Sequence, residues 1–208
     1  MALVKRHLPA DPPQVQPEVG REGLVGQLQD PHPDARWRAA RSLADDPTTA
    51  GTLCARLAQE ADHAVQGALL TALIGFDSLE AAQGLIPLLR SSEAGLRNAV
   101  VEALQRMPKA AGPLVEPLLT DADRDIRIFA IDILHELRPP GAAAWLERLL
   151  EQDSDVNVCA AAVNCLADMG TSESVPSLRA VIERFPREPF LLFAARAAIR
   201  LIAAARTA

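Results

Sequence analysis

The chain contains very few aromatic residues. Aromatic side chains make up 3% of its 208 residues, and tyrosine is absent. No short stretch rich in Val, Ile and Thr alternates apolar with polar side chains, as a half-buried strand would. Hydrophobic residues nevertheless make up 49%, with Ala and Leu dominant. Such a composition argues against a β-sheet fold and is typical of helices that approach one another closely.

Several classes of function also lack their usual signals. The formal net charge is −6, so the basic stripe that binds a phosphate backbone is not expected, and no nucleic-acid partner is predicted. No GxxxxGK or GxGxxG loop is present to hold a phosphate. The three cysteines, Cys54, Cys159 and Cys165, form no CxxC pair, which fits the reducing cytoplasm.

Long hydrophobic runs are missing as well. The most apolar stretch, residues 190–205, is interrupted by Arg196 and Arg200, and charges at such positions disfavour a membrane span. Residues 1–7 lack the apolar centre of a secretory signal. We therefore expect a cytoplasmic protein with no membrane partner.

The main positive feature is an internal repeat of about 31 residues. Each copy begins with a small or apolar residue, with a small or apolar residue four positions later and a large aliphatic residue eight positions later; the residue three positions later is also small or apolar, except for Arg38 in the first copy. The spacings between successive starts are 30, 31, 30, 32 and 33 residues. A repeat of this length predicts stacked helical hairpins that bury their apolar faces against their neighbours. The starts are Ala35, Val65, Leu96, Ile126, Val158 and Leu191.

Six hairpins are predicted over residues 20–206, preceded by a flexible Pro-rich arm at residues 1–19. First helices are expected near 20–29, 48–59, 79–90, 111–120, 141–152 and 173–184. Second helices are expected near 34–45, 63–75, 94–107, 123–137, 155–169 and 188–205. Pro176 suits a first helical turn, whereas Pro87 and Pro117 should kink or shorten their helices at matching places.

The second-helix pattern resembles that of HEAT repeats. Asp125-Ile126-Arg127 is followed by Ala130 and Leu134, and Asp34-Ala35-Arg36 is followed by Ala39, Ala40 and Leu43. The short period and Gly170 are most similar to the HEAT-like repeats of phycobilisome bilin lyases. The resemblance implies an all-α, right-handed α-solenoid, in which second helices line a concave groove. It also implies a role in protein binding, because such repeats serve as adaptors, scaffolds, lyase subunits and a few enzymes.

In each second helix, offsets 0, 3, 4, 7, 8 and 11 from the repeat start share one face and should form the core. The opposite face should look into the groove and bind a protein partner. Its middle is acidic, so the expected partner has basic and apolar character. The candidate binding residues are Trp37, Arg41, Asn98, Glu102, Ile128, Asp132, His135, Asn164 and Phe193.

Some of these residues have a purely structural alternative. Trp37 and Phe193 could bind a partner or shield the two ends of the stack, and the sequence leaves both interpretations open. Mid-stack Ile128 favours binding. Arg36, Arg97 and Arg127 directly follow the repeat start and are predicted to pair with turn aspartates such as Asp34, Asp123 and Asp125, linking neighbouring repeats. Gln66 and Cys159 interrupt this arginine series.

Catalytic and metal chemistry find little support. Asp132, His135 and Glu136 share a helical face with ligand-like spacing, but HEAT-like deoxyhypusine hydroxylases use several His-Glu pairs and this chain has one. A solvated charged face is the favoured interpretation. The cysteines are expected to be structural thiols. We predict a non-catalytic adaptor or scaffold without a cofactor, resembling small HEAT proteins of bacterial signalling. The alternative is a bilin lyase-like or cofactor-handling chaperone subunit.

Overall fold

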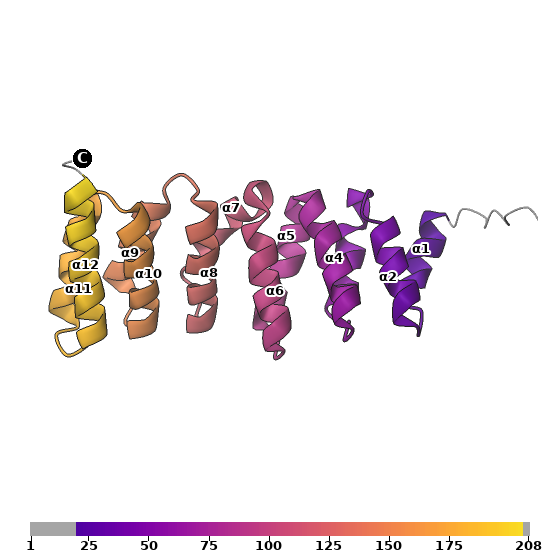
Figure 1. Cartoon of the computed structure of the whole chain (residues 1–208), viewed down its shortest axis with the longest axis horizontal. Helices are drawn as coiled ribbons and strands as arrows, with labels where there is room; N and C mark the ends of the chain where they lie inside the picture. The colour runs from indigo at the N-terminus through magenta and orange to yellow at the C-terminus, as the bar shows by residue number, and fades with distance from the viewer. Residues whose placement is uncertain (1–19, 206–208) are drawn as a thin grey trace, which may run out of the picture.

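The computed structural model describes residues 20–205, and the predicted arm at residues 1–19 lies outside them. Six consecutive helical hairpins stack side by side, so that the two ends of the described chain lie at opposite ends of an elongated molecule (Figure 1). No strand occurs in residues 20–205. The prediction of an all-α solenoid with six hairpins is therefore confirmed.

The first helices of the hairpins form one layer of the stack. Short 3₁₀ segments, η1 (Pro47–Thr49) and η3 (Ser172–Ser174), precede two of them, and η2 (Ile86–Arg90) follows a third. The first helices are α1 (Arg21–Gln27), α3 (Ala50–Leu57), α5 (Leu79–Leu85), α7 (Pro108–Leu118), α9 (Ala142–Gln152) and α11 (Val175–Arg184).

The second helices form the other layer, and each packs against the second helix of the next hairpin along the whole stack. Their regular order is visible from α2 to α12 in Figure 1. They are α2 (Pro33–Ser42), α4 (His63–Phe76), α6 (Ala94–Gln105), α8 (Arg124–Leu137), α10 (Val156–Met169) and α12 (Pro189–Ala205).

The first-helix layer is less continuous. Helices α3, α5 and α7 pack in series, and α9 packs on α11, but α7 and α9 make few contacts with each other. Helices α1 and α3 also make few contacts, so the first-helix layer is interrupted there and at this α7–α9 seam, while α8 and α10 remain packed on the opposite side.

The core follows the repeat. In α8, Ile126, Ala130, Ile133 and Leu134 are almost completely buried, as the offsets predict. Asp62, Asp123 and Asp155 cap α4, α8 and α10 by accepting hydrogen bonds from backbone N–H groups of the first helical turn. Such caps satisfy donors that have no partner inside the helix. Periodic burial and regular caps together explain why the helix positions were predictable.

The proline predictions were confirmed in part. Pro176 lies in the first turn of α11, as expected, and α5 gives way to η2 at Ile86, next to Pro87. However, α7 passes through both Pro113 and Pro117 as an α-helix. These two prolines are one turn apart on the exposed side of α7, so the carbonyl groups that lose an N–H partner face solvent.

The predicted arginine partners were wrong. Arg36 forms a bidentate pair with Glu60, at 2.7 and 2.8 Å, and Arg127 pairs with Asp153 at 2.6 and 3.2 Å. Each therefore reaches the turn of the next hairpin, instead of Asp34, Asp123 or Asp125. Arginine side chains do link neighbouring repeats, but through acids that end the next first helix.

The residue that follows the repeat start also hydrogen-bonds within its own hairpin. Arg36, Arg97 and Arg127 each donate to the backbone oxygen six residues earlier, at 2.9, 2.7 and 2.8 Å. Gln66 donates to the backbone oxygen of Glu60 at 2.7 Å, so it makes this hydrogen bond in place of an arginine. In the fifth hairpin the residue after the repeat start is Cys159, whose thiol is a weak donor to the backbone oxygen of Asp153. The same oxygen accepts a stronger hydrogen bond from Arg184, at 2.9 Å. These side chains therefore provide hydrogen-bond donors for backbone carbonyl groups at the ends of the first helices, which have no partner within the helix.

Candidate partner-binding face

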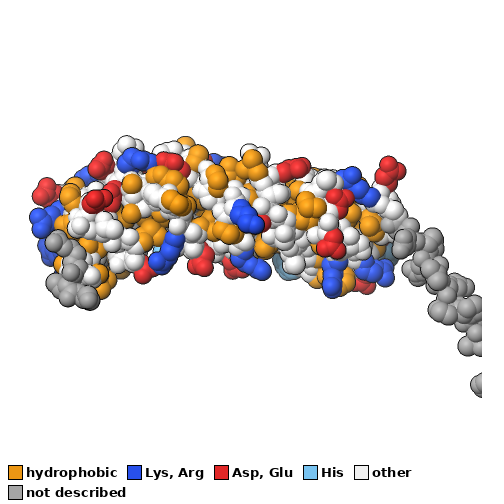
Figure 2. Space-filling view, turned by 90° about the horizontal axis from the view of Figure 1, so that it is seen from above, with side chains coloured by type: hydrophobic (Ala, Val, Ile, Leu, Met, Phe, Trp, Pro, Cys, Tyr) orange, Lys and Arg blue, Asp and Glu red, His pale blue; other side chains and the backbone are white. Residues whose placement is uncertain are grey.

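The exposed side of the second helices carries the predicted binding residues. Arg41, Asn98, Glu102, Asp132, His135, Asn164 and Phe193 are exposed, and Trp37 and Ile128 are half-buried. The view along the helices shows apolar side chains between two charged long edges of the molecule (Figure 2). The sequence therefore placed these side chains on the accessible side of the stack, although accessibility alone does not establish binding.

Four of the predicted residues surround one hollow between α6 and α8. Asn98 and Glu102 lie on α6, while Asp132 and His135 lie on α8. The hollow has a volume of about 340 Å³, and Val101, Gln105, Phe129 and Glu136 complete its lining. We call this the α6–α8 hollow. It combines carboxylates at its rim with apolar side chains at its base.

The charge of the α6–α8 hollow is negative. Glu102 and Glu136 make no ion pair within the part of the chain that the structure describes. Burial raises the pKa of the Asp132 carboxyl, and the nearby His135 opposes that shift. Gln105 donates to the Asp132 backbone oxygen at 3.2 Å and joins the two helices. Carboxylates without cationic partners attract a basic ligand.

His135 is turned toward the neighbouring hairpin. Its Nε2 lies 3.0 Å from Asp168 Oδ2, and Arg138 pairs with the same carboxylate. These two contacts lower the pKa of Asp168, with the hydrogen bond from His135 as the largest cause. Among residues 20–205, no group of three or more His, Cys, Asp or Glu side chains could hold a metal ion.

The three large apolar residues at the shared offset have different surroundings. Arg41 stacks over the Trp37 ring, with its guanidinium carbon 4.7 Å from the ring centroid. Ile128 packs against the core from its half-buried position. Phe193, in contrast, is 67% exposed. Phe193 is also distant in sequence and hairpin order from the α6–α8 hollow.

The thiols occur in buried positions. Cys54, Cys159 and Cys165 are free and buried. Burial raises the pKa of Cys54 to about 11 and that of Cys165 to about 12, and it also raises the pKa of Cys159. A thiol with a raised pKa is a poor nucleophile at neutral pH.

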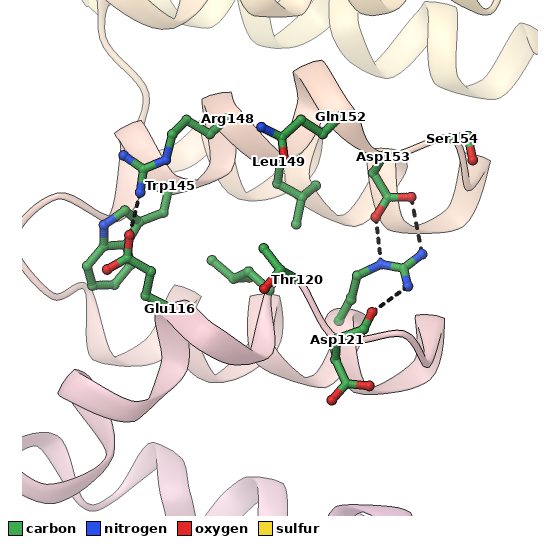
Figure 3. A pocket seen from close by; sticks show the side chains of 11 residues that line it. Glu116, Thr120, Asp121, Trp145, Arg148, Leu149, Gln152, Asp153 and Ser154 are labelled. Carbon is green, nitrogen blue, oxygen red and sulfur yellow. Dashed lines mark hydrogen bonds and ion pairs between the residues drawn. The ribbon is translucent and has the colours of Figure 1, made fainter.

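A second hollow, which the sequence analysis missed, lies in the α7–α9 seam on the first-helix side. It has a volume of about 440 Å³. In Figure 3, Leu149 and Thr120 lie between the Glu116–Arg148 ion pair, with Trp145 beside it, and Asp153. Asp153 pairs with Arg127. The remaining carboxylate, Asp121, pairs with Arg90. Because these charges are already matched, the hollow offers no free charge to a ligand. Trp145 was the available sequence signal, on a helix assigned to the outer layer.

Comparisons with known proteins agree with this architecture. The family model for HEAT repeats matches residues 21–105 and 111–200. The chain belongs to the HEAT-repeat family. Comparison with curated proteins gives no match. Within residues 20–205 of this HEAT-repeat protein, no helix combines the length and hydropathy needed to cross a membrane.

Solved structures of similar fold include natural and designed repeat proteins. An archaeal HEAT-like repeats protein from Thermococcus onnurineus NA1 is 14% identical, with a TM-score of 0.50 over 88% of this chain and 87% of that chain. A designed armadillo repeat protein in complex with the peptide (KR)4 is 19% identical, with a TM-score of 0.44 and coverage of 89% and 99%. The CpcE–CpcF complex of phycocyanin lyase from Nostoc sp. PCC7120 is 17% identical, with a TM-score of 0.37 and coverage of 96% and 99%. At these identities the similarity concerns the fold alone.

Proposed function

We propose that this HEAT-repeat protein is a non-catalytic adaptor or scaffold that binds a basic and apolar segment of another protein on its second-helix face. The α6–α8 hollow carries the proposal, because Glu102, Asp132 and Glu136 surround apolar Val101 and Phe129. Lysine or arginine side chains would pair with the carboxylates while apolar side chains contact the base. Ile128 would extend the apolar contact along α8.

The structure of the face suits binding better than catalysis. The thiols are buried, and His135 is paired with Asp168. The carboxylates are held on packed helices, which keeps them in place before a partner arrives and lowers the entropic cost of binding. Electrostatic attraction by exposed carboxylates should speed association and make it sensitive to salt.

A fluorescent synthetic peptide of alternating lysine and leucine tests the proposal, with a glutamate–leucine peptide of equal length as the control ligand. The wild-type protein should bind the lysine peptide and discriminate against the glutamate peptide. Glu102→Lys combined with Asp132→Lys should weaken binding at least about tenfold at low salt. Ile128→Ala should have its larger effect at high salt, where the charge term is screened.

The matched control is Glu151→Lys combined with Glu183→Lys, which makes the same change of charge at exposed positions of α9 and α11. It should bind the lysine peptide with nearly wild-type affinity. Equal losses in both double variants would show a non-specific charge effect and contradict the site.

Absorbance of the purified protein addresses the bilin-handling alternative, for which a visible chromophore band is expected.

A further inference from the structure

Helix α12 exposes an apolar stripe that the stack leaves uncovered. Of the four large hydrophobic side chains that are exposed in residues 20–205, three belong to this helix: Phe190 at 68%, Phe193 at 67% and Leu201 at 56%. Half-buried Ala197 lies between them. The intervals of 3, 4 and 4 residues keep the four side chains in one strip along the helix. We call these residues the α12 stripe.

The stripe is distinct from the side of α12 that packs on the protein. Leu191, Ala195, Ala198 and Ile202 are buried, and α12 makes its main contacts with α10 and α11. The offset of Phe193 also carries Trp37 and Ile128 in other hairpins. At the offsets of Ala197 and Leu201, however, no other hairpin has a hydrophobic side chain: the residues there are Arg41 and Asp45, Thr71 and Gly75, Glu102 and Arg106, Asp132 and Glu136, and Asn164 and Asp168. The continuous stripe is therefore particular to α12 and is not required by the repeat.

Positive charge borders the stripe. Arg196 and Arg200 are exposed on α12 and make no ion pair within the described residues. Helix α12 contains no acidic residue. Near α10 the acids are already engaged, since Asp168 pairs with Arg138 and the N-cap Asp155 with Arg124. Glu183 of α11 and Glu188, just before α12, are exposed and form no ion pair with these arginines. Two arginines beside an apolar strip thus remain available for carboxylates of a partner.

A further repeat of the same kind would not cover this helix. At the offset of Arg196, the five preceding hairpins bury Ala40, Leu70, Val101, Ile131 and Val163 against the next hairpin. Arg196 instead presents a charge at the end of the stack, as expected for a terminal repeat. Burial of that arginine without a partner carboxylate would be costly. The surface of α12 around Arg196 is therefore unsuited to an apolar neighbour and suited to an acidic one.

We propose that the α12 stripe is a second docking surface, which binds an acidic amphipathic helix of a partner protein. Leu, Ile or Phe side chains of that helix would pack on Phe190, Phe193 and Leu201, and its flanking glutamates or aspartates would pair with Arg196 and Arg200. With 17 residues, α12 is long enough for several turns of a lengthwise helix contact. Exposed aromatic residues next to arginine are typical of residues that dominate binding.

Two copies of α12 are poor partners for each other. An isologous contact would bring Arg196 and Arg200 of one copy toward the same residues of the other, with no acid on either helix to compensate. Charge complementarity thus points to a different chain. The preference is opposite to that of the α6–α8 hollow, so the two sites can be tested separately.

The test uses the full-length protein and two labelled 18-residue helical peptides with leucines at positions i, i+3, i+4 and i+7. Glutamates flank the leucines in one peptide and lysines in the other. Because the α6–α8 hollow is expected to bind a lysine peptide, both peptides are titrated into the Glu102→Gln/Asp132→Asn variant, in which that hollow has lost two of its carboxylates. Fluorescence anisotropy should then show that the glutamate peptide binds at least about tenfold more tightly than the lysine peptide. Phe190→Ser combined with Phe193→Ser should reduce that affinity at least about tenfold. Arg196→Glu combined with Arg200→Glu should reverse the charge preference.

Leu79→Ser is the matched control, because Leu79 is an exposed apolar residue, at 53%, on the distant helix α5. It should leave binding unchanged, and circular dichroism should show equal helix content in all variants. Equal binding by the Phe190→Ser/Phe193→Ser variant and the wild type would overturn the proposal. So would co-sedimentation with phosphatidylserine vesicles without peptide binding, which would indicate a membrane surface, or concentration-dependent dimerisation that Phe193→Ser abolishes, which would indicate a second copy.

Discussion

At the scale of single residues, burial separates side chains that stabilise the stack from those available to partners. Leu134 and Asp132 lie two positions apart on α8, yet the first is completely buried and the second is exposed. The sequence predicted this difference because the core offsets repeat in every hairpin. It could not predict that Arg36 pairs with Glu60, because that contact depends on the height at which successive hairpins stack.

Replacement of these two α8 residues should have very different effects on stability. Leu134→Ala removes a fully buried side chain from the middle of the stack and should lower the free energy of unfolding by about 2–5 kcal/mol. Asp132→Ala should change it by less than about 0.5 kcal/mol. Denaturant titration followed by circular dichroism measures both values. Equal losses would mean that the facing of α8 is wrong.

Glu60 should make stability depend on pH. Burial alone would raise the pKa of Glu60, but hydrogen bonds from Arg36, the Asp62 N–H group and Arg56 lower it to about 2, from 4.5. The unfolded chain binds a proton more readily, so this stabilisation is present above about pH 4.5 and is lost as the pH falls toward 2.

Thermal unfolding between pH 7 and pH 3 tests that contribution. The melting temperature of the wild type should fall over the acidic part of this range, and Glu60→Gln should flatten part of the fall while lowering stability at pH 7. The reason for the loss at neutral pH is that Arg36, nearly buried, keeps its charge without an anionic partner. Asp34→Asn, at an exposed position in the first turn of α2, is the control. Identical pH profiles for all three proteins would contradict this role of Glu60.

At the scale of helices, turn chemistry and periodic burial made most positions predictable from the sequence. Aspartates such as Asp123 cap second helices, and prolines begin others. The exceptions follow from local geometry. Pro113 and Pro117 share the exposed side of α7. Water can hydrogen-bond there to the two carbonyl groups that lose an intrahelical N–H partner. The α6–α8 hollow was foreseen as an acidic face. The α7–α9 seam was not, because the distance between two first helices is not encoded in a single repeat.

At the scale of the whole molecule, the seam divides the solenoid into unequal parts. The α9–α12 part packs closely within itself. Its link to the preceding hairpins depends on the packing of α8 on α10 and on four ion pairs, of which Arg127–Asp153 is the most buried; the others are Arg124–Asp155, Arg138–Asp168 and Glu116–Arg148. Repeat proteins unfold in units set by the strength of the contacts between neighbours. We therefore expect residues 142–205 to open as a unit before the central hairpins do.

Hydrogen exchange in low concentrations of guanidinium chloride, measured by mass spectrometry, tests this expectation. Peptides from α9 to α12 should share one opening free energy, and peptides from α3 to α8 should share a different one. Arg127→Ala removes the Arg127–Asp153 ion pair across the seam. It should increase the difference between the opening free energies of the two groups of peptides. Arg148→Ala, which removes only an exposed pair with Glu116, should have a smaller effect. A single opening free energy throughout would contradict the division.

Arg196 also has a consequence for how such a protein can grow. A solenoid built from similar hairpins has no geometric reason to stop, because every added unit recreates the surface on which the next can pack. At the position that is apolar and buried in the five preceding hairpins, the sixth carries Arg196, so a further hairpin of the same kind would have to bury an unpaired charge. Duplication of a hairpin inside the array would leave Arg196 in place, and a longer array would expose the same charge on its last described helix.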